Sequence, residues 1–197
     1  DGHVLRVDLR LRPNPEVTPI VMSVNSTISY YESSALPWEQ AAFIRSRASA
    51  GDKALGEAFL SAIQPFIWRR SLDFRQLKEI GAMTDRIRDH YAQGQAFGLG
   101  YDLKRGRGGI REIEFFTQVH QLIYGGRDAS LREPTTVKAL DALTKAGRIE
   151  ADVAARLQGH YAVLRRLEHR LQMVEDQQTH NLPQQIEGLD RVACLDG

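Results

Sequence analysis

Residues 101–127 have the sequence YDLKRGRGGIREIEFFTQVHQLIYGGR. A glycine-rich basic loop, 104–109, leads directly into a segment whose apolar residues recur at helical spacing, and this segment ends at Gly125-Gly126. We therefore predict a helix of about four turns over 110–124. Its apolar side chains cover well over half of the circumference, so the helix should lie inside a bundle. The strip expected to face water contains Arg111, Glu114, Gln118 and Gln121.

Two polar residues interrupt the apolar arc of this helix. Glu112 lies in the first turn, where it either reaches a polar site beside the glycine loop or stabilises the helix N-terminus through the macrodipole. His120 lies farther along the arc, and we expect a hydrogen-bonded core histidine rather than a metal ligand, because the six histidines lack metal-ligand spacing.

The composition indicates an ordinary globular protein. The 197 residues include 26 basic and 25 acidic ones, which suits one or two folded domains, and the net charge of +1 gives no overall case for nucleic acid or an anionic membrane. The single cysteine, Cys194, cannot form an internal disulfide. No apolar run has the length of a membrane span and no signal peptide is present. We expect a cytoplasmic protein.

Residues 4–12, VLRVDLRLR, alternate between apolar and charged side chains and predict a half-buried β-strand. Three prolines follow, and 20–22 are expected to form a short second strand. Asp1-Gly2 is a turn pair that normally joins two strands. We therefore expect a preceding strand upstream of residue 1, in a longer polypeptide.

The rest of the chain has helical patterns. Ser26 is expected to cap the first helix, Pro37 to open the second and Asp52 to cap the third, while 93–100, with three glycines, is the clearest break. About seven helices are expected in all. Besides 110–124, the ranges are 26–32, 37–47, 52–68, 74–92, 134–147 and 151–178.

The charged face of the first strand is the best candidate for chemistry. Asp8 lies among arginines on one side of the strand, where a carboxylate can hold a divalent cation and guanidinium groups can hold phosphate. The alternative is a solvated face whose charges pair with each other. One carboxylate is too few for a Mg²⁺ site in phosphoryl transfer, so its partners should lie on the missing upstream strand. The phosphate-binding candidates on this strand are Arg10 and Arg12.

A second group of candidates lies at the glycine loop. The string GRGG resembles a phosphate cradle but lacks the spacing of a P-loop. On charge and proximity, Lys104, Arg107 and Glu112 are assigned to phosphate or nucleotide binding. Arg45 and Arg47 have the i, i+2 spacing of an extended segment or of two different helix faces, and we expect surface arginines there.

Several strings together resemble one family, the bifunctional glutamine synthetase adenylyltransferase/adenylyl-removing enzymes. They occur in the order of the family and cover nearly the whole chain. The strings are RVDLRLRP (6–13), WEQAAFIRSRASAGD (38–52), FIWRRSLDF (66–74), GRGGIREIEFFTQVHQLIYGGR (106–127) and LRRLEHRLQMVEDQQTHNLP (164–183).

The resemblance implies a mainly α fold, in which a helical bundle (51–197) follows the last strand or strands of a truncated polymerase-β-like nucleotidyltransferase α+β domain (1–50). Such enzymes have two related halves, and GGIREIEF and LRRLEHRLQ resemble the half that removes AMP from a tyrosine of glutamine synthetase by phosphorolysis, which yields ADP. Asp8 matches the third metal-binding carboxylate of the family, beside a GSDxD pair that is absent here. The segment NPEVTP (14–19) departs from the glycines that often follow RLRP.

The resemblance further implies Mg²⁺ as cofactor, and glutamine synthetase, the PII signalling protein, ATP or ADP and phosphate as partners. Residues 1–197 alone are expected to be inactive. Two alternatives stay open: the half that transfers AMP from ATP to glutamine synthetase, or a non-catalytic helical module that binds glutamine synthetase or PII.

Overall fold

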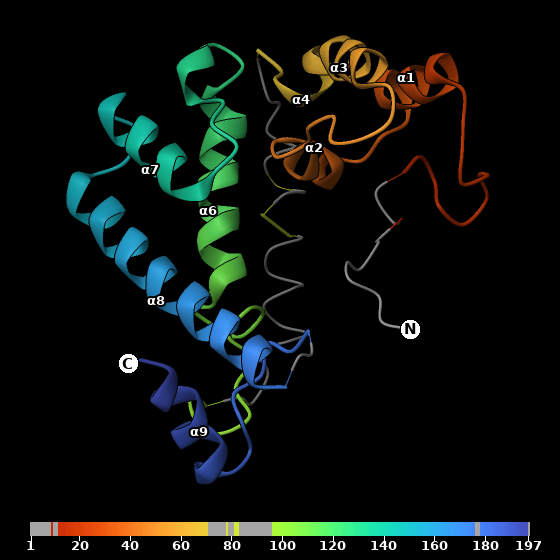
Figure 1. The fold of residues 1–197 in the computed structure, drawn as a ribbon. Coiled ribbons are helices and arrows are strands. Elements are labelled where there is room, and N and C mark those ends of the chain that lie inside the picture. The colour runs from red at the N-terminus through yellow and green to blue at the C-terminus, as the bar shows by residue number, and fades with distance from the viewer. Residues whose placement is uncertain are drawn as a thin grey trace.

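The computed structural model describes residues 9, 12–70, 78, 81–82, 96–175 and 178–196. Within these ranges the chain is mainly α-helical, as predicted, with eight α-helices, two short 3-10 helices and no strand (Figure 1). The α-helices are α1 (Val24–Ser33), α2 (Pro37–Phe43), α3 (Lys53–Ala62), α4 (Gln64–Ile67), α6 (Ile110–Tyr124), α7 (Thr136–Lys145), α8 (Ala151–Glu175) and α9 (Ile186–Ala193); the 3-10 helices are η1 (Ala129–Leu131) and η2 (Cys194–Asp196).

Helix α6 stands at the centre of the molecule. Helices α1 to α4 lie on one side of it and α7 and α8 on the other (Figure 1), and α6 contacts α2, α7 and α8. One aromatic core forms between α6 and the first four helices, where Phe115 and Leu122 of α6 pack with Tyr31, Phe43, Ile63 and Phe66. The predicted bounds of this helix, 110–124, are confirmed.

The helix ends where two backbones come close together. A methyl group on Gly126 would lie 1.9 Å from the carbonyl oxygen of Arg69, and one on Gly125 would lie 2.8 Å from the indole of Trp68. These positions therefore need glycine because the α4 end of the chain packs directly on them.

The predicted water-facing strip of α6 is wrong at Gln121. This side chain is 1% exposed, and its amide nitrogen donates to the carbonyl oxygens of Leu131 and Glu133, at 2.7 and 2.8 Å. Sequence periodicity cannot show that a neighbouring loop supplies two carbonyl acceptors, so a polar residue in the buried interface was mistaken for a surface one.

Several helix boundaries also differ from the prediction. The first helix is capped by Ser23, whose hydroxyl accepts from the Ser26 amide at 3.2 Å. The second helix ends at Phe43 instead of residue 47. The third is divided into α3 and α4 near Pro65, because proline lacks the amide that a continuous helix requires.

Other predictions have mixed outcomes. Asp52 caps α3 as expected, through the Leu55 amide at 3.0 Å. Residues 20 and 21 form a bend and residue 22 has no regular structure, so the predicted short strand is absent here. The predicted strand 4–12 and helix 74–92 lie largely outside the described residues.

A second core lies at the other end of the molecule, where α9 contacts α8 (Figure 1). The chain before α6 and the chain after α8 run antiparallel here, with an isolated bridge between Asp102 and Asn181. Helix α9 was not predicted, because eight residues are too few for a clear periodic signal. The apolar members of this core are Tyr101, Leu103, Leu171, Leu182 and Val192. No helix in the described part of the chain is long and apolar enough to cross a membrane.

We expect Gln121→Leu to lower the free energy of unfolding by about 2 kcal/mol, because two buried carbonyl groups lose their donor. Gln118→Leu, on the same helix and with a partly exposed side chain, is the control and should change it by less than about 0.5 kcal/mol. Urea denaturation of both variants measures the difference. Equal effects would show that the two hydrogen bonds of Gln121 add nothing.

Candidate functional site

The glycine loop is held by a carboxylate within its own turn. Asp102 is 5% exposed, and its Oδ1 accepts from the backbone amides of Lys104 and Arg105 at 2.9 and 2.8 Å. Its Oδ2 accepts from Nε of Arg105 at 2.7 Å. The carboxylate of Asp102 thus neutralises part of the positive charge of the loop.

Glu112 closes the other side of the loop. Its Oε2 accepts from the Gly108 amide at 3.0 Å, and Gly108 has a φ of +78°, which glycine adopts readily. This geometry supports the interpretation of Glu112 as a carboxylate that stabilises the start of α6. Most backbone amides of this stretch are therefore engaged, since those of Gly106, Gly109, Ile110, Arg111 and Glu112 also donate to carbonyl oxygens between residues 102 and 109.

Most backbone amides of the loop already have acceptors. An anion at this loop would therefore be bound by side chains. Lys104 is partly exposed, with Nζ 4.0 Å from a carboxylate oxygen of Glu168. Arg107 is exposed, and its guanidinium makes no ion pair among the described residues. Its carbonyl oxygen accepts from the hydroxyl of Tyr101.

Glu168 of α8 is the most buried charged group near the loop, at 2% exposure. Its Oε2 accepts from Nη1 of Arg165 at 2.5 Å. Nδ1 of His180 lies 2.8 Å from Oε1, and this contact is an ion pair only when the imidazole is protonated. With Lys104, this carboxylate joins three cationic or titratable side chains from the loop, from α8 and from the segment before α9.

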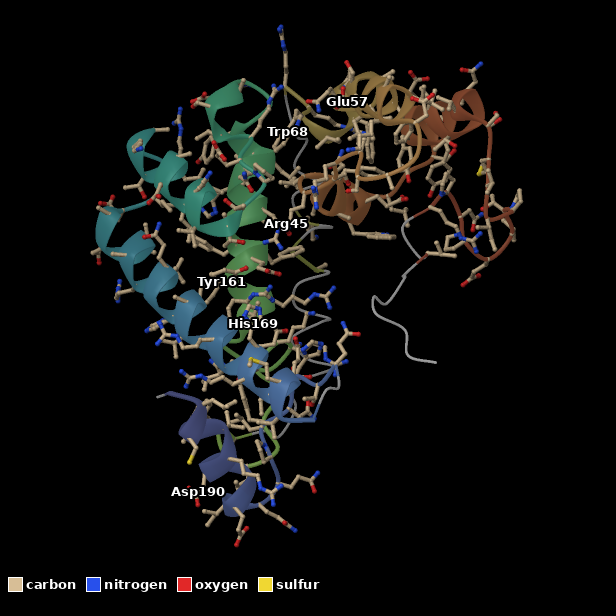
Figure 2. All side chains as sticks on the ribbon, in the orientation of Figure 1. Arg45, Glu57, Trp68, Tyr161, His169 and Asp190 are labelled. Atoms are coloured by element: carbon tan, nitrogen blue, oxygen red, sulfur yellow. The ribbon has the colours of Figure 1, made fainter. Side chains whose placement is uncertain are left out.

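A second polar junction joins four parts of the chain around Glu114 of α6. Nη1 of Arg45 lies 3.1 Å from Oε1 of Glu114, and the hydroxyl of Tyr161 donates to the same oxygen at 2.9 Å. Arg45 also donates to the hydroxyl of Thr136. Figure 2 labels Arg45 beside α6 and Tyr161 on α8. Arg45 is exposed, as expected for a surface residue, and its guanidinium also binds across the junction.

Of the three candidate residues on the predicted strand, the structure describes Arg12. Asp8 and Arg10 lie outside the described residues. Arg12 donates to the carbonyl oxygens of Pro15 and Thr18, at 2.8 and 3.2 Å, and so ties down the loop that follows it. In this geometry two of its guanidinium nitrogens already have acceptors.

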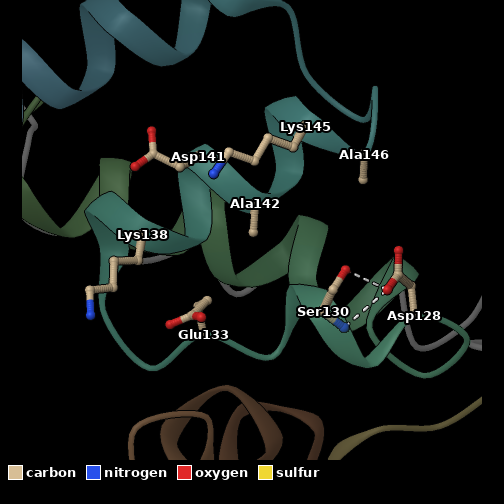
Figure 3. Close-up of a pocket in the computed structure, with 8 residues that line it drawn as sticks. All are labelled: Asp128, Ser130, Glu133, Lys138, Asp141, Ala142, Lys145 and Ala146. Carbon is tan, nitrogen blue, oxygen red and sulfur yellow. Dashed lines mark hydrogen bonds between the residues drawn. The ribbon is translucent and has the colours of Figure 1, made fainter.

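A surface hollow of about 500 Å³ lies far from the glycine loop in sequence, between η1 and α7 (Figure 3). The hollow is lined by the amino groups of Lys138 and Lys145 and by three carboxylates, those of Asp128, Glu133 and Asp141. Asp128 accepts from the amide and hydroxyl of Ser130, and these hydrogen bonds hold the pKa of its carboxyl below the usual range. Within the described ranges, no cluster of histidine, cysteine, aspartate or glutamate has the arrangement of a metal site.

Sequence reasoning missed Asp102, Glu168 and His180. A signal was present for Glu168, a charged residue between Leu167 and Leu171 on the inner face of a long amphipathic helix. Such a position favours a paired, buried charge.

Comparison with known proteins shows which families this chain is similar to. Residues 1–62 match the family model described as glutamate-ammonia ligase adenylyltransferase, and residues 80–197 match the model described as GlnD PII-uridylyltransferase. Both descriptions name enzymes that transfer a nucleotidyl group, so the chain is related to nucleotidyltransferases.

The relatives narrow this class. The chain is 50% identical to a bifunctional glutamine synthetase adenylyltransferase/adenylyl-removing enzyme of Caulobacter vibrioides, and 47% and 48% identical to enzymes of the same name from Bradyrhizobium sp. (strain ORS 278) and Rhodopseudomonas palustris (strain HaA2). Each match covers all 197 residues of this chain and 20% of the relative. The chain belongs to the family of bifunctional glutamine synthetase adenylyltransferase/adenylyl-removing enzymes, which confirms the resemblance seen in the sequence.

We expect Glu168→Gln to lower the free energy of unfolding by about 1 to 3 kcal/mol, because the loop and α8 cations lose their buried counter-charge. Asp152→Asn is the matched control, since it breaks an exposed ion pair of the same helix, with Arg156 at 3.1 Å. That change should cost less than about 0.5 kcal/mol. Urea denaturation at pH 7 compares the two, and similar losses would contradict a special role for Glu168.

His180 should make stability depend on pH. Burial, reinforced by Lys104, lowers the pKa of its imidazole. The unfolded chain takes up this proton near pH 6.5, whereas the folded chain does so only at lower pH. The free energy of unfolding should therefore fall as the pH drops below about 6.5. Urea denaturation at pH 7.5 and 5.5 should show a smaller pH dependence in His180→Asn than in the natural chain. Identical dependence would assign the effect to other groups.

Proposed function

We propose that this chain belongs to the adenylyl-removing part of such an enzyme and helps to remove AMP from adenylylated glutamine synthetase. The observation that carries the proposal is a match over all 197 residues, at 46–50% identity, to enzymes whose name includes this activity. The strings GGIREIEF and LRRLEHRLQ favour the removing half. The packing of α6 on α8, which contain most of these strings, and the pairing of both helices with Arg45 of the string WEQAAFIRSRASAGD support a common role for the strings.

The proposed reaction is a phosphorolysis. An oxygen of inorganic phosphate attacks the phosphorus of AMP-tyrosine, the bond between that phosphorus and the tyrosine oxygen breaks, and the oxygen takes up a proton. The products are ADP and tyrosine. Positioning of the phosphate groups and neutralisation of their charge supply most of the catalysis in reactions of this type.

In this proposal Asp8 is a catalytic residue that binds Mg²⁺, and Arg10 neutralises phosphate oxygens. Magnesium sites use several carboxylates or substrate phosphates, so the other ligands are assigned to a part of the enzyme outside this chain. Mg²⁺ would stabilise the charge that develops on the transferred phosphoryl group. Arg12 also contributes positive charge here and fixes the following loop through its two carbonyl contacts.

The glycine loop has a supporting role in this proposal. Lys104 and Arg107 provide positive charge for the nucleotide or phosphate, and Glu112 keeps the loop in shape through the Gly108 amide. The proposed division places the end of the nucleotidyltransferase domain at 1–50 and the helical bundle at 51–197. Its setting is cytoplasmic, with glutamine synthetase and PII as protein partners.

The experiment described below also tests two other functions. The first is transfer of AMP from ATP to a tyrosine of glutamine synthetase, in which the tyrosine oxygen attacks the α-phosphorus and pyrophosphate leaves. The second is a non-catalytic module that binds glutamine synthetase or PII, and the engaged amides of the glycine loop favour it, because they leave few donors for a phosphate.

The test uses the complete enzyme that contains this chain, as the natural protein and as Asp8→Asn. We expect phosphate-dependent ADP release from adenylylated glutamine synthetase to fall at least about 100-fold in the variant, with ATP-dependent adenylylation unchanged. Asp152→Asn, at an exposed position of α8, is the control and should leave both activities intact.

The other outcomes separate the alternatives. Loss of adenylylation with ADP release intact would assign the chain to the transferring half. Retention of both activities would favour the binding module.

A further inference from the structure

A second surface hollow lies where α1, the end of α3 and α4 meet, on one side of α6 (Figure 1). Its volume is about 470 Å³. Small-molecule sites in proteins have volumes of roughly 300 to 1,000 Å³, so a ligand of that class fits here. The hollow includes part of the string FIWRRSLDF, to which the proposed function assigns no role.

The floor of the hollow is apolar and belongs to the aromatic core. Tyr31, Ile63 and Phe66 line it and are at most 5% exposed. The ring centroids of Tyr31 and Phe66 lie 5.4 Å apart, so core packing holds the floor in place. Pro65 lies exposed beside them and adds an apolar ring to the lining. This part of the hollow suits a flat, largely apolar group.

Two adjacent arginines, Arg69 and Arg70, also line the hollow. The guanidinium of Arg69 lies over the Phe66 ring, 5.8 Å from its centroid, and Arg70 is exposed. Neither guanidinium has a carboxylate partner among the described residues. Guanidinium groups bind phosphate oxygens with paired hydrogen bonds, so this pair favours a ligand that contains a phosphate group.

The end of α6 fixes the backbone of the arginine pair. The carbonyl oxygen of Arg70 accepts from Nε of Arg127 at 2.9 Å, and the carbonyl of Arg69 packs directly on Gly126. Trp68, just before the pair, is 7% exposed. Because the backbone is held in this way, only the two side chains have to be ordered when a ligand binds, which lowers the cost of binding.

Glu32 of α1 supplies the carboxylate of the hollow. It is exposed and makes no ion pair within the described part of the chain, so its oxygens can accept from hydroxyl or amino groups of a ligand. A phosphate monoester has a charge of about −1.5 to −2 at pH 7, which matches two arginines. A ligand with a single carboxylate would leave one arginine unpaired, and a triphosphate would bring excess negative charge close to Glu32.

We propose that this hollow binds a nucleoside monophosphate. The phosphate lies between Arg69 and Arg70, the base covers Pro65 and the apolar floor, and the ribose hydroxyls donate to Glu32. This ligand combines the three groups that the lining calls for, namely a phosphate, a flat ring and hydroxyl donors. The proposal rests on the hollow and does not depend on which AMP reaction the enzyme catalyses.

The test is photoaffinity labelling of the complete enzyme with 8-azido-AMP, followed by mass spectrometry of the labelled peptides. We expect a label within residues 62–70. Arg70→Glu should reduce this label at least tenfold, because a carboxylate replaces a phosphate-binding cation. Its melting temperature should be unchanged, since Arg70 is exposed and contacts Arg127 through its backbone carbonyl. Arg47→Glu, also at an exposed position, is the charge-matched control and should leave the label unchanged.

Competition identifies the groups that the hollow recognises. Excess AMP should remove the label, whereas adenosine and inorganic phosphate at the same concentration should not, because each lacks one part of the ligand. Equal protection by adenosine or by inorganic phosphate would overturn the proposal, and so would the absence of a label in 62–70.

The variant Asp8→Asn separates this proposal from the proposed activity. It should keep the label in 62–70 even though phosphate-dependent ADP release falls. Loss of this label in Asp8→Asn would show that labelling depends on the catalytic metal, and it would overturn a separate binding site at the hollow.

Discussion

The burial of α6 on two opposite sides is the constraint on which the rest of the structure depends. One side completes the aromatic core through Phe115 and Leu122, and the other packs on α7 and α8. Polar side chains of α6 therefore have to find partners inside the molecule. Gln121 finds two carbonyl groups, and Glu114 finds Arg45 and Tyr161. The helix thus contributes apolar side chains to the core and also joins neighbouring segments through polar contacts.

The sequence predicted the apolar part of this arrangement well. The bounds of α6, those of α7 to within two residues at each end and the start of α8 follow from periodic apolar residues and from the glycines that end the first two. It failed at Gln121, which is buried against a neighbouring loop, and it did not show that the exposed Arg45 pairs with α6, because periodicity contains no information about partners. Short elements such as α9 were missed for a different reason, since eight residues hardly repeat the helical period.

At the candidate site, too, the sequence indicated which side chains are charged but not which groups they contact. The charges of Lys104, Arg107 and Glu112 indicated a ligand-binding loop, but the sequence did not reveal that Asp102 and Glu112 occupy its backbone amides. Much of this motif therefore maintains the shape of the loop. Family membership was predictable because several separate strings agreed in order, and no single string had to be decisive.

The pairing of the chain before α6 with the chain after α8 has a consequence for evolution. Backbone hydrogen bonds join Leu103 to His180, Leu182 to Tyr101 and Gly100 to Pro183, so a block of about 80 residues begins and ends at one place. A block whose two ends meet can be attached to different neighbours without changing its interior. Two differently named enzyme families match this chain on either side of residues 63–79, and the block lies within the second match.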